Sequence, residues 1–208
     1  MRNPRHNHFF IQGSISEVTR HQEGMVRQDA AKLAGDEFGK LSVDELATAL
    51  ARRHSIDVPE LDEASITSTP PRDVQIDVSQ DPFRHIRDRS RPFNMAGTEI
   101  KISVPFQGDA ALFAVRPMSF TTSFPMGDVV GSAVVFTKAG IDLKSDETLR
   151  EFNGWLAEIK QYLGWHREAL VGFNDRLLGV ARTEIEQRKA KLDRDKDLGA
   201  GLGFPIKG

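Results

Sequence analysis

TEIKISVPF, residues 98–106, is the stretch that decides the fold. Its apolar residues alternate with polar ones, which is the period of a strand with one buried face. The apolar set is Ile100, Ile102, Val104 and Phe106. Two further apolar runs follow, AALFAVRPM (110–118) and DVVGSAVVFTK (128–138). Gly108 and Asp109 supply a turn, so the sequence predicts an antiparallel hairpin there and a third strand after Gly127.

The segments before this stretch predict one more strand and two helices. Val74, Ile76 and Val78 alternate with polar residues, which predicts a strand that joins the same sheet and brings it to about four strands. Ser14 with Glu17, and Ser42 with Glu45, have capping-box spacing. These pairs predict an N-terminal helical hairpin whose helices run to Gly35 and to about His54.

A long apolar stripe dominates the C-terminal part. Its residues recur at alternating spacings of three and four, as in a heptad repeat: Leu149, Phe152, Leu156, Ile159, Leu163, His166, Leu170, Phe173, Leu177 and Val180. The pattern predicts one amphipathic helix of coiled-coil type over 146–192, and a bend near Gly164 is favoured over a break. The predicted fold class is α+β, a small antiparallel sheet with an N-terminal helical hairpin and this long C-terminal helix.

The length of that helix predicts an interaction. It would measure about 70 Å, whereas a compact chain of this length is about 43 Å across. Part of the helix must therefore project or bend back, and its apolar residues Leu170, Phe173, Leu177 and Val180 need a cover. The N-terminal helices or a second copy could supply that cover. We expect a homo-oligomer, or a partner protein or domain, at these residues.

The order of the chain suggests three parts. Residues 1–54 form the helical segment, and residues 55–72, with Pro70 and Pro71, form an extended linker. Residues 73–208 hold the sheet and the long helix, and are expected to form one compact unit with 1–54.

Composition narrows the classes of function. The 208 residues carry a formal charge of −2 and no cysteine, so no global field attracts nucleic acid and no thiol chemistry is available. No apolar run is long enough to span a membrane, and we expect a cytoplasmic protein without membrane contact. Phosphate loops, dinucleotide fingerprints and histidine pairs at zinc-ligand spacing are missing from the sequence, so we expect no cofactor and no metal, and a non-enzyme is favoured.

One constellation could carry chemistry. Asp77, Glu99 and Lys101 resemble the acid-spacer-E-x-K set of metal-dependent nucleases, in which carboxylates hold Mg²⁺ and the lysine stabilises developing charge. The competing interpretation is a set of charged pairs on the outer face of a strand, and it is favoured because E-x-K recurs at Glu158 without that context.

The most basic window lies between Asp81 and Phe93. Its four arginines, Arg84, Arg87, Arg89 and Arg91, could hold phosphate groups, and the flanking Phe83 and Phe93 could stack on bases. The alternative is a solvated loop whose arginines pair with nearby carboxylates. The small net positive charge of the loop favours this alternative.

His166 lies within the apolar stripe. A neutral, hydrogen-bonded core imidazole is the simpler interpretation of this position. A pH-sensitive device that fixes the helix register is the sharper one.

Several short motifs carry a resemblance. They are PFQGD at 105–109 with Phe113 and Pro117, Phe173-Asn174, Arg188-Lys189 and LGFPIK at 202–207. With these motifs, residues 97–208 resemble the N-terminal half of bacterial multidomain proteins in which a TIR or nuclease-like effector follows. The resemblance implies a sensing, assembly or scaffold module in phage defence, with the FPIK segment leading toward a partner domain. This chain has no effector half, so no catalytic residue follows from the resemblance.

Together these patterns predict a non-catalytic interaction, sensing or assembly module of a bacterial cytoplasmic system that binds through the 146–192 helix. The alternative is a metal-dependent nuclease or nucleic-acid-binding protein that uses Asp77, Glu99, Lys101 and the 84–91 arginine loop.

Overall fold

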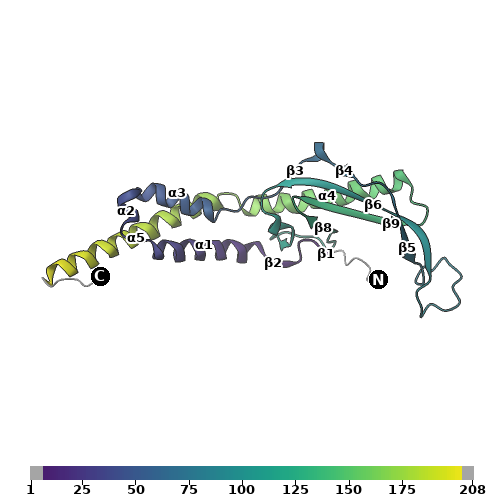
Figure 1. The fold of residues 1–208 in the computed structure, drawn as a ribbon, viewed down its shortest axis with the longest axis horizontal. Helices are drawn as coiled ribbons and strands as arrows, with labels where there is room; N and C mark the ends of the chain where they lie inside the picture. The colour runs from purple at the N-terminus through teal and green to yellow at the C-terminus, as the bar shows by residue number, and fades with distance from the viewer. Residues whose placement is uncertain (1–6, 203–208) are drawn as a thin grey trace. The chain divides into compact units, whose positions relative to one another are not determined.

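The computed structural model describes residues 7–202 (Figure 1). Its internal contacts divide the chain into two units, and each unit combines two separate stretches. The sheet unit contains the residues up to Gln12 together with Val58–His166. The helical unit contains Gly13–Asp57 and the residues from Arg167 onward. The grouping therefore differs from the sequential division into 1–54, 55–72 and 73–208.

The sheet unit is built around one long strand, β6 (Asn94–Gln107). Antiparallel to it runs β9 (Ala133–Gly140), in a register that pairs Val104 with Val134. On the far side of β9 follow β8 (Met126–Val130) and β1 (Asn7–His8). Three strands share the other edge of β6, and they are β3 (Glu60–Leu61), β4 (Thr67–Ser68) and β5 (Arg72–Asp77). The four longest strands, β5, β6, β8 and β9, confirm the predicted antiparallel sheet.

The predicted hairpin at Gly108-Asp109 is wrong. After β6 the chain forms a short 3₁₀ helix, η2 (Ala110–Phe113), because Leu112 and Phe113 turn into the core instead of alternating along a strand. The run DVVGSAVVFTK is not one strand but the β8–β9 hairpin, in which Val130 faces Ala133. Gly131 stands in the two-residue turn with φ +59°, a conformation that glycine adopts without steric cost.

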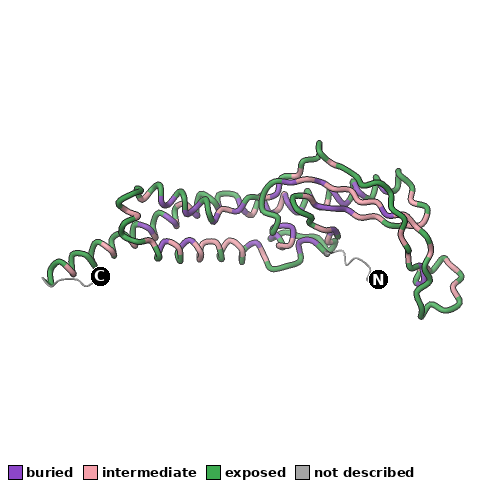
Figure 2. Tube along the Cα trace, in the orientation of Figure 1, coloured by how far each residue is buried: buried purple, intermediate pink, exposed green. Residues whose placement is uncertain are grey.

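One helix covers the sheet, α4 (Ser145–Ala169). Val104 and Phe106 of β6, with Val134 and Phe136 of β9, meet the apolar face of this helix. The buried helix residues in this core are Phe152, Trp155, Leu156, Ile159, Tyr162 and Leu163. Figure 2 shows buried residues along α4 and the facing strands. The alternation predicted for 98–106 therefore holds for its C-terminal half, where the strand lies under the helix.

The two predicted N-terminal helices are confirmed as α1 (Ile15–Lys32) and α3 (Val43–Arg53). Each begins with the capping box expected from the sequence, in which Ser14 Oγ accepts from the Glu17 N–H at 3.3 Å and Ser42 Oγ accepts from the Glu45 N–H at 3.2 Å. The remaining short elements are β2 (Gln12–Ser14), α2 (Glu37–Lys40), η1 (Glu63–Ser65) and β7 (Val115–Arg116).

The long C-terminal helix is present but interrupted. α4 continues through Gly164, where the bend was expected, and ends at Ala169, while α5 (Phe173–Gly201) begins after Gly172. Gly172 has φ +68°, which is incompatible with a helical hydrogen-bond ladder. The position of the bend was thus predicted wrongly. The apolar stripe itself crosses the interruption, since Leu170 and Phe173 keep helical spacing on either side of it.

The helical unit has its own core. Phe173 and Leu177 of α5 are almost fully buried against α1 and α3. The other buried apolar residues of this unit are Ile15, Val26, Ala30, Leu46, Ala47, Leu50, Ala51, Ile56, Leu170, Ala181 and Ile185. Ion pairs between helices flank the core, for example Arg182 with Asp44 at 2.9 Å. The same stripe therefore serves two cores, one with the sheet and one with the N-terminal helices.

Candidate functional site

The loop 78–93 joins β5 to β6 and is closed at its base by Asp77. Asp77 Oδ1 accepts hydrogen bonds from the N–H of Ser79 at 2.9 Å and from the N–H of Phe93 at 3.1 Å. The backbone N–H and side chain of Ser79, and then the N–H of Phe93, hold the pKa of Asp77 below its usual range. The ionised carboxylate of Asp77 therefore holds the two ends of the loop together.

Arg89 organises the interior of this loop. Its guanidinium donates to three backbone carbonyls, those of Ser79 at 3.2 Å, Asp81 at 2.9 Å and Arg84 at 2.8 Å. In return, the Arg89 carbonyl accepts from Gln80 Nε2 at 3.1 Å. A guanidinium presents several donors in a fixed plane, so one side chain can set the path of several residues.

Arg84 is also used within the loop. Its Nε donates to Asp81 Oδ2 at 3.0 Å, and its Nη1 approaches the sulfur of Met95 at 3.2 Å. The four arginines proposed as phosphate ligands thus divide into two pairs. Arg84 and Arg89 donate hydrogen bonds to atoms of the loop, whereas Arg87 makes none among the described residues and Arg91 lies 3.7 Å from Asp88. Arg87, Arg89 and Arg91 are all exposed residues.

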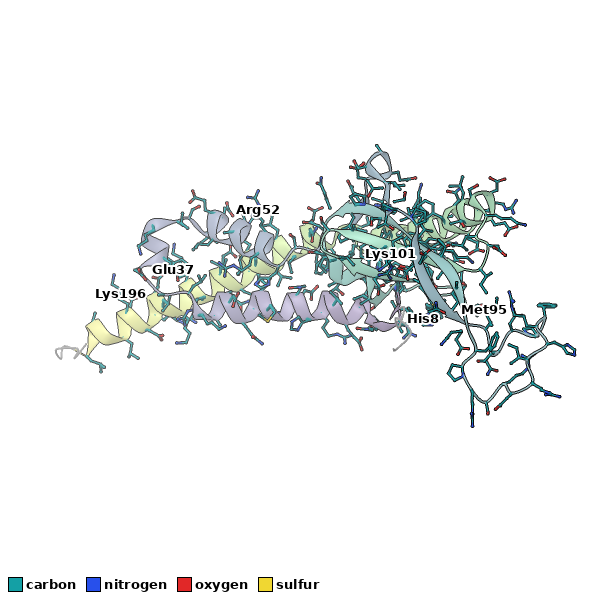
Figure 3. The ribbon with its side chains drawn as sticks, turned by 45° about the vertical axis from the view of Figure 1, so that its right-hand side comes forward. His8, Glu37, Arg52, Met95, Lys101 and Lys196 are labelled. Carbon is teal, nitrogen blue, oxygen red and sulfur yellow. The ribbon has the colours of Figure 1, made fainter. Side chains whose placement is uncertain are left out.

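The ordered loop keeps aromatic rings in solvent. Phe83 is 97% exposed and Phe93 is 51% exposed. Figure 3 shows the loop extending beyond Met95 at the end of the sheet. Each phenylalanine follows a proline, and the N–H of Phe83 is bound by Asp81 Oδ1 at 3.0 Å just as that of Phe93 is bound by Asp77. The backbone of both residues is therefore held in place while the rings stay exposed.

The suggested nuclease residues are only partly brought together. Asp77 lies opposite Asn94, whereas Glu99 is opposite Arg72, five positions further along β6. At about 3.4 Å per residue, this offset is about 17 Å, too far for one metal ion to bridge. Glu99 and Lys101 share a face as predicted, but Glu99 is buried and accepts from Arg72 Nη2 at 2.7 Å. Each carboxylate therefore already has partners: Asp77 binds the two ends of the loop, and Glu99 binds Arg72 of the neighbouring strand.

The described residues hold neither a cluster of metal ligands nor a helix that could cross a membrane. Among residues 7–202 we find no group of three or more histidine or acidic residues placed to hold a metal ion. Over the same residues, each helix is too short or too polar to cross a membrane.

Most of the residues expected to bind a partner lie inside the helical unit. Phe173 and Leu177 are 1% and 0% exposed, Leu170 is buried, and Val180 is partly buried. Of the two covers considered for these residues, the structure supplies the N-terminal helices α1 and α3. These residues are therefore packed in a core within this chain, and the binding of a partner protein at them stays a prediction.

His166 is a fully buried residue of the sheet unit. Its Nε2 lies 3.0 Å from the carbonyl oxygen of Val115, and its Nδ1 has no partner among the described residues. Burial lowers the pKa of His166, and the backbone groups of Val115 and Leu112 oppose that effect. The simpler interpretation, a neutral core imidazole that donates from Nε2, fits this geometry.

Sequence reasoning missed a second aromatic surface, on the segment 116–126. The Arg116 guanidinium lies 5.3 Å from the centre of the Phe120 ring, and Phe120 stacks on Phe124 at 6.4 Å. Tyr162 fastens the segment to α4, since its hydroxyl donates to the Ser123 carbonyl at 2.8 Å. Two phenylalanines within a run of serine and threonine, SFTTSFP, were the available signal.

The terminal FPIK motif falls within residues 203–208, outside the described residues. In comparisons of the sequence and of the fold, no family model, no curated protein and no solved structure matches this chain.

Proposed function

We propose that this chain is a non-catalytic binding module that contacts its partner through the loop 78–93. The observation that carries the proposal is the exposure of Phe83 on a loop with a defined conformation. A loop without such order would lose conformational entropy when it binds, which lowers its affinity. An ordered loop has already lost that entropy on folding.

The hydrogen-bonding pattern supports a role beyond connection. A simple hairpin needs two to five residues to reverse the chain, and this loop uses 78–93. Asp77, Asp81 and Arg89 direct their polar atoms to the backbone of the loop instead of to the sheet. These contacts hold the loop in shape without covering its aromatic residues, which is the arrangement expected of a recognition loop on a rigid scaffold.

A photo-crosslinking residue placed at Phe83 tests the proposal in the cells that naturally make the protein. We expect a discrete adduct from position 83 and none from position 171, where Val171 is similarly exposed in the helical unit. Digestion of the adduct with protease or with nuclease then identifies the class of the partner. Identical adducts from both positions, or none from position 83, would refute a binding role for the loop.

A separate observation favours self-association as a second candidate. Ile185 is the last buried residue among the described part of α5, yet the helix continues to Gly201, about 24 Å further at 1.5 Å per residue. Leu198 and Leu202 on this extension are 66% and 60% exposed. A second copy of the helix could cover them, and the sequence-based expectation of a homo-oligomer is kept in this narrower form.

Light scattering at increasing protein concentration tests this second candidate. We expect the mass to rise above that of a monomer and to return to it in a Leu198→Ser/Leu202→Ser variant. A monomer at high micromolar concentration would contradict self-association. The bacterial and phage-defence settings implied by the resemblance, and the cytoplasmic location expected from the composition, belong to the same proposal. A plaque assay with and without the gene tests the role in phage defence.

A further inference from the structure

We propose that the partner of the loop 78–93 is single-stranded nucleic acid, with bases stacked on Phe83 and Phe93 and phosphates held by Arg87 and Arg91. This inference rests on the proposed function, because it names the chemistry of a partner for the same loop.

The charge of the loop is complementary to a phosphate backbone. Its four arginines outnumber its two aspartates, within a chain whose formal charge is −2, so the positive charge is local. Arg87 has no ion-pair partner within the described residues, and the Arg91 side chain is 86% exposed with only a distant contact to Asp88. An exposed pair of this kind is weak, so both guanidinium groups can exchange water for phosphate oxygens.

The two rings with the two outward arginines suit single-stranded bases and phosphates better than they suit an anionic lipid surface. Every base has a flat π-face, so stacking on Phe83 and Phe93 does not depend on sequence. Recruitment to an anionic membrane generally uses clusters of four to eight basic residues, whereas this loop directs only Arg87 and Arg91 outward. Two rings and two outward arginines are the parts of a short single-strand contact.

The internal hydrogen bonds explain why the other two arginines are needed. Arg89 and Arg84 fix the backbone on which the outward residues stand, and their charge raises the local potential without contacting the ligand. Substitution of Arg87 should therefore weaken binding while leaving the loop ordered. Substitution of Arg89 should weaken binding and also disorder the loop, because its three hydrogen bonds to loop carbonyls are lost.

Fluorescence anisotropy with labelled single strands of thymidine or uridine, about 12 nucleotides long, tests the inference. We expect micromolar binding at low salt, weakened about tenfold by Phe83→Ala. The double variant Arg87→Glu/Arg91→Glu should reduce the slope of log K against log salt by about 1.4, since each phosphate contact on a single strand contributes about 0.7.

Two matched controls carry the same chemical changes elsewhere. Phe120→Ala removes another exposed ring, and Arg150→Glu/Arg167→Glu makes the same charge change on exposed arginines of α4. Both should leave affinity within about twofold of the unmodified chain, apart from a uniform effect of net charge that the salt series measures.

The outcomes separate this inference from the proposed function. Failure to bind the oligonucleotides up to about 100 µM, the range of non-specific affinity, would overturn it, as would binding that the loop variants do not weaken. Phe83-dependent co-sedimentation with phosphatidylserine vesicles, without oligonucleotide binding, would overturn it in favour of a membrane. A protein adduct at position 83 without oligonucleotide binding would overturn the nucleic-acid inference but not the proposed binding role of the loop. Absence of any adduct at position 83 would overturn the binding role and, with it, the nucleic-acid inference.

Discussion

Replacement of Gly172 by alanine is expected to destabilise the helical unit by about 1–2 kcal/mol, the cost of placing a Cβ in the left-handed region. Gly172 has φ +68°, and no other atom lies within 4 Å of a Cβ built there, so the penalty comes from the backbone alone. Gly179 provides the matched position. It also lacks neighbours within 4 Å, but it lies inside α5, where Gly→Ala should stabilise by about 0.4–1 kcal/mol.

Urea unfolding followed by circular dichroism at 222 nm measures the difference. The two variants should differ by about 2 kcal/mol, which separates their midpoints by roughly 1 M for an m-value of about 2 kcal/mol per M. The two tryptophans, Trp155 and Trp165, both lie on the part of α4 that belongs to the sheet unit. Their fluorescence follows that unit and serves as an internal reference for the two variants.

Gly164→Ala completes the test at the position where sequence analysis placed the bend. Because Gly164 is helical and unobstructed, alanine there should stabilise the sheet unit and raise the fluorescence midpoint. If Gly172→Ala raised stability as much as Gly179→Ala, residue 172 would have to be helical. The interruption between α4 and α5 would then be refuted.

Three further predictions follow from single side chains. Burial lowers the pKa of His166 below 6.5. Below about pH 6.5 the unfolded chain therefore binds a proton at this residue that the folded chain does not bind. The free energy of unfolding should decrease there by up to about 1.4 kcal/mol for each pH unit of acidification. His166→Gln should remove that part of the pH dependence in urea titrations, and an unchanged slope would contradict it. Arg89→Lys should speed tryptic cleavage of the loop 78–93, because one ammonium cannot serve three carbonyls, whereas Arg87→Lys should not; equal rates would argue against the organising role of Arg89. Asn174→Ala should cost about 1–3 kcal/mol in urea unfolding, because the Asn174 amide bonds both the N–H and the carbonyl of buried Ile56, at 3.1 and 3.2 Å. An unchanged midpoint would show that water replaces these bonds.

Features set by neighbouring residues were predictable. Both capping boxes need only a serine and a glutamate three positions later, so the starts of α1 and α3 followed from the sequence. The position of the hairpin did not follow from the sequence. Turns were possible at both Gly108 and Gly131, and which of them joins two paired strands depends on which strand pairs with β6. The strand that pairs with β6 is β9, which begins more than twenty residues after the end of β6. A local sequence pattern does not predict a pairing over that distance.

The interruption of the long helix escaped prediction for a related reason. The stripe keeps its three-four spacing through Leu170 and Phe173, so periodicity alone shows one helix where the backbone forms two. The loop 78–93 was predictable in composition but not in geometry. Four arginines can be counted in the sequence, yet only the fold reveals that Arg84 and Arg89 turn inward.

The apolar stripe that α4 and α5 share has a consequence for the folding of the protein during translation. α1 and α3 leave the exit tunnel before α5, the helix that packs on both of them, and about 120 residues separate the end of α3 from the start of α5. The residues that α5 helps to cover include Val26, Leu46 and Leu50. At 5–20 residues per second, these apolar faces wait about 6–24 s for their cover. We therefore expect chaperones to bind the N-terminal helices during translation, and slow codons between β5 and β9 to lengthen the interval in which nascent chains can aggregate.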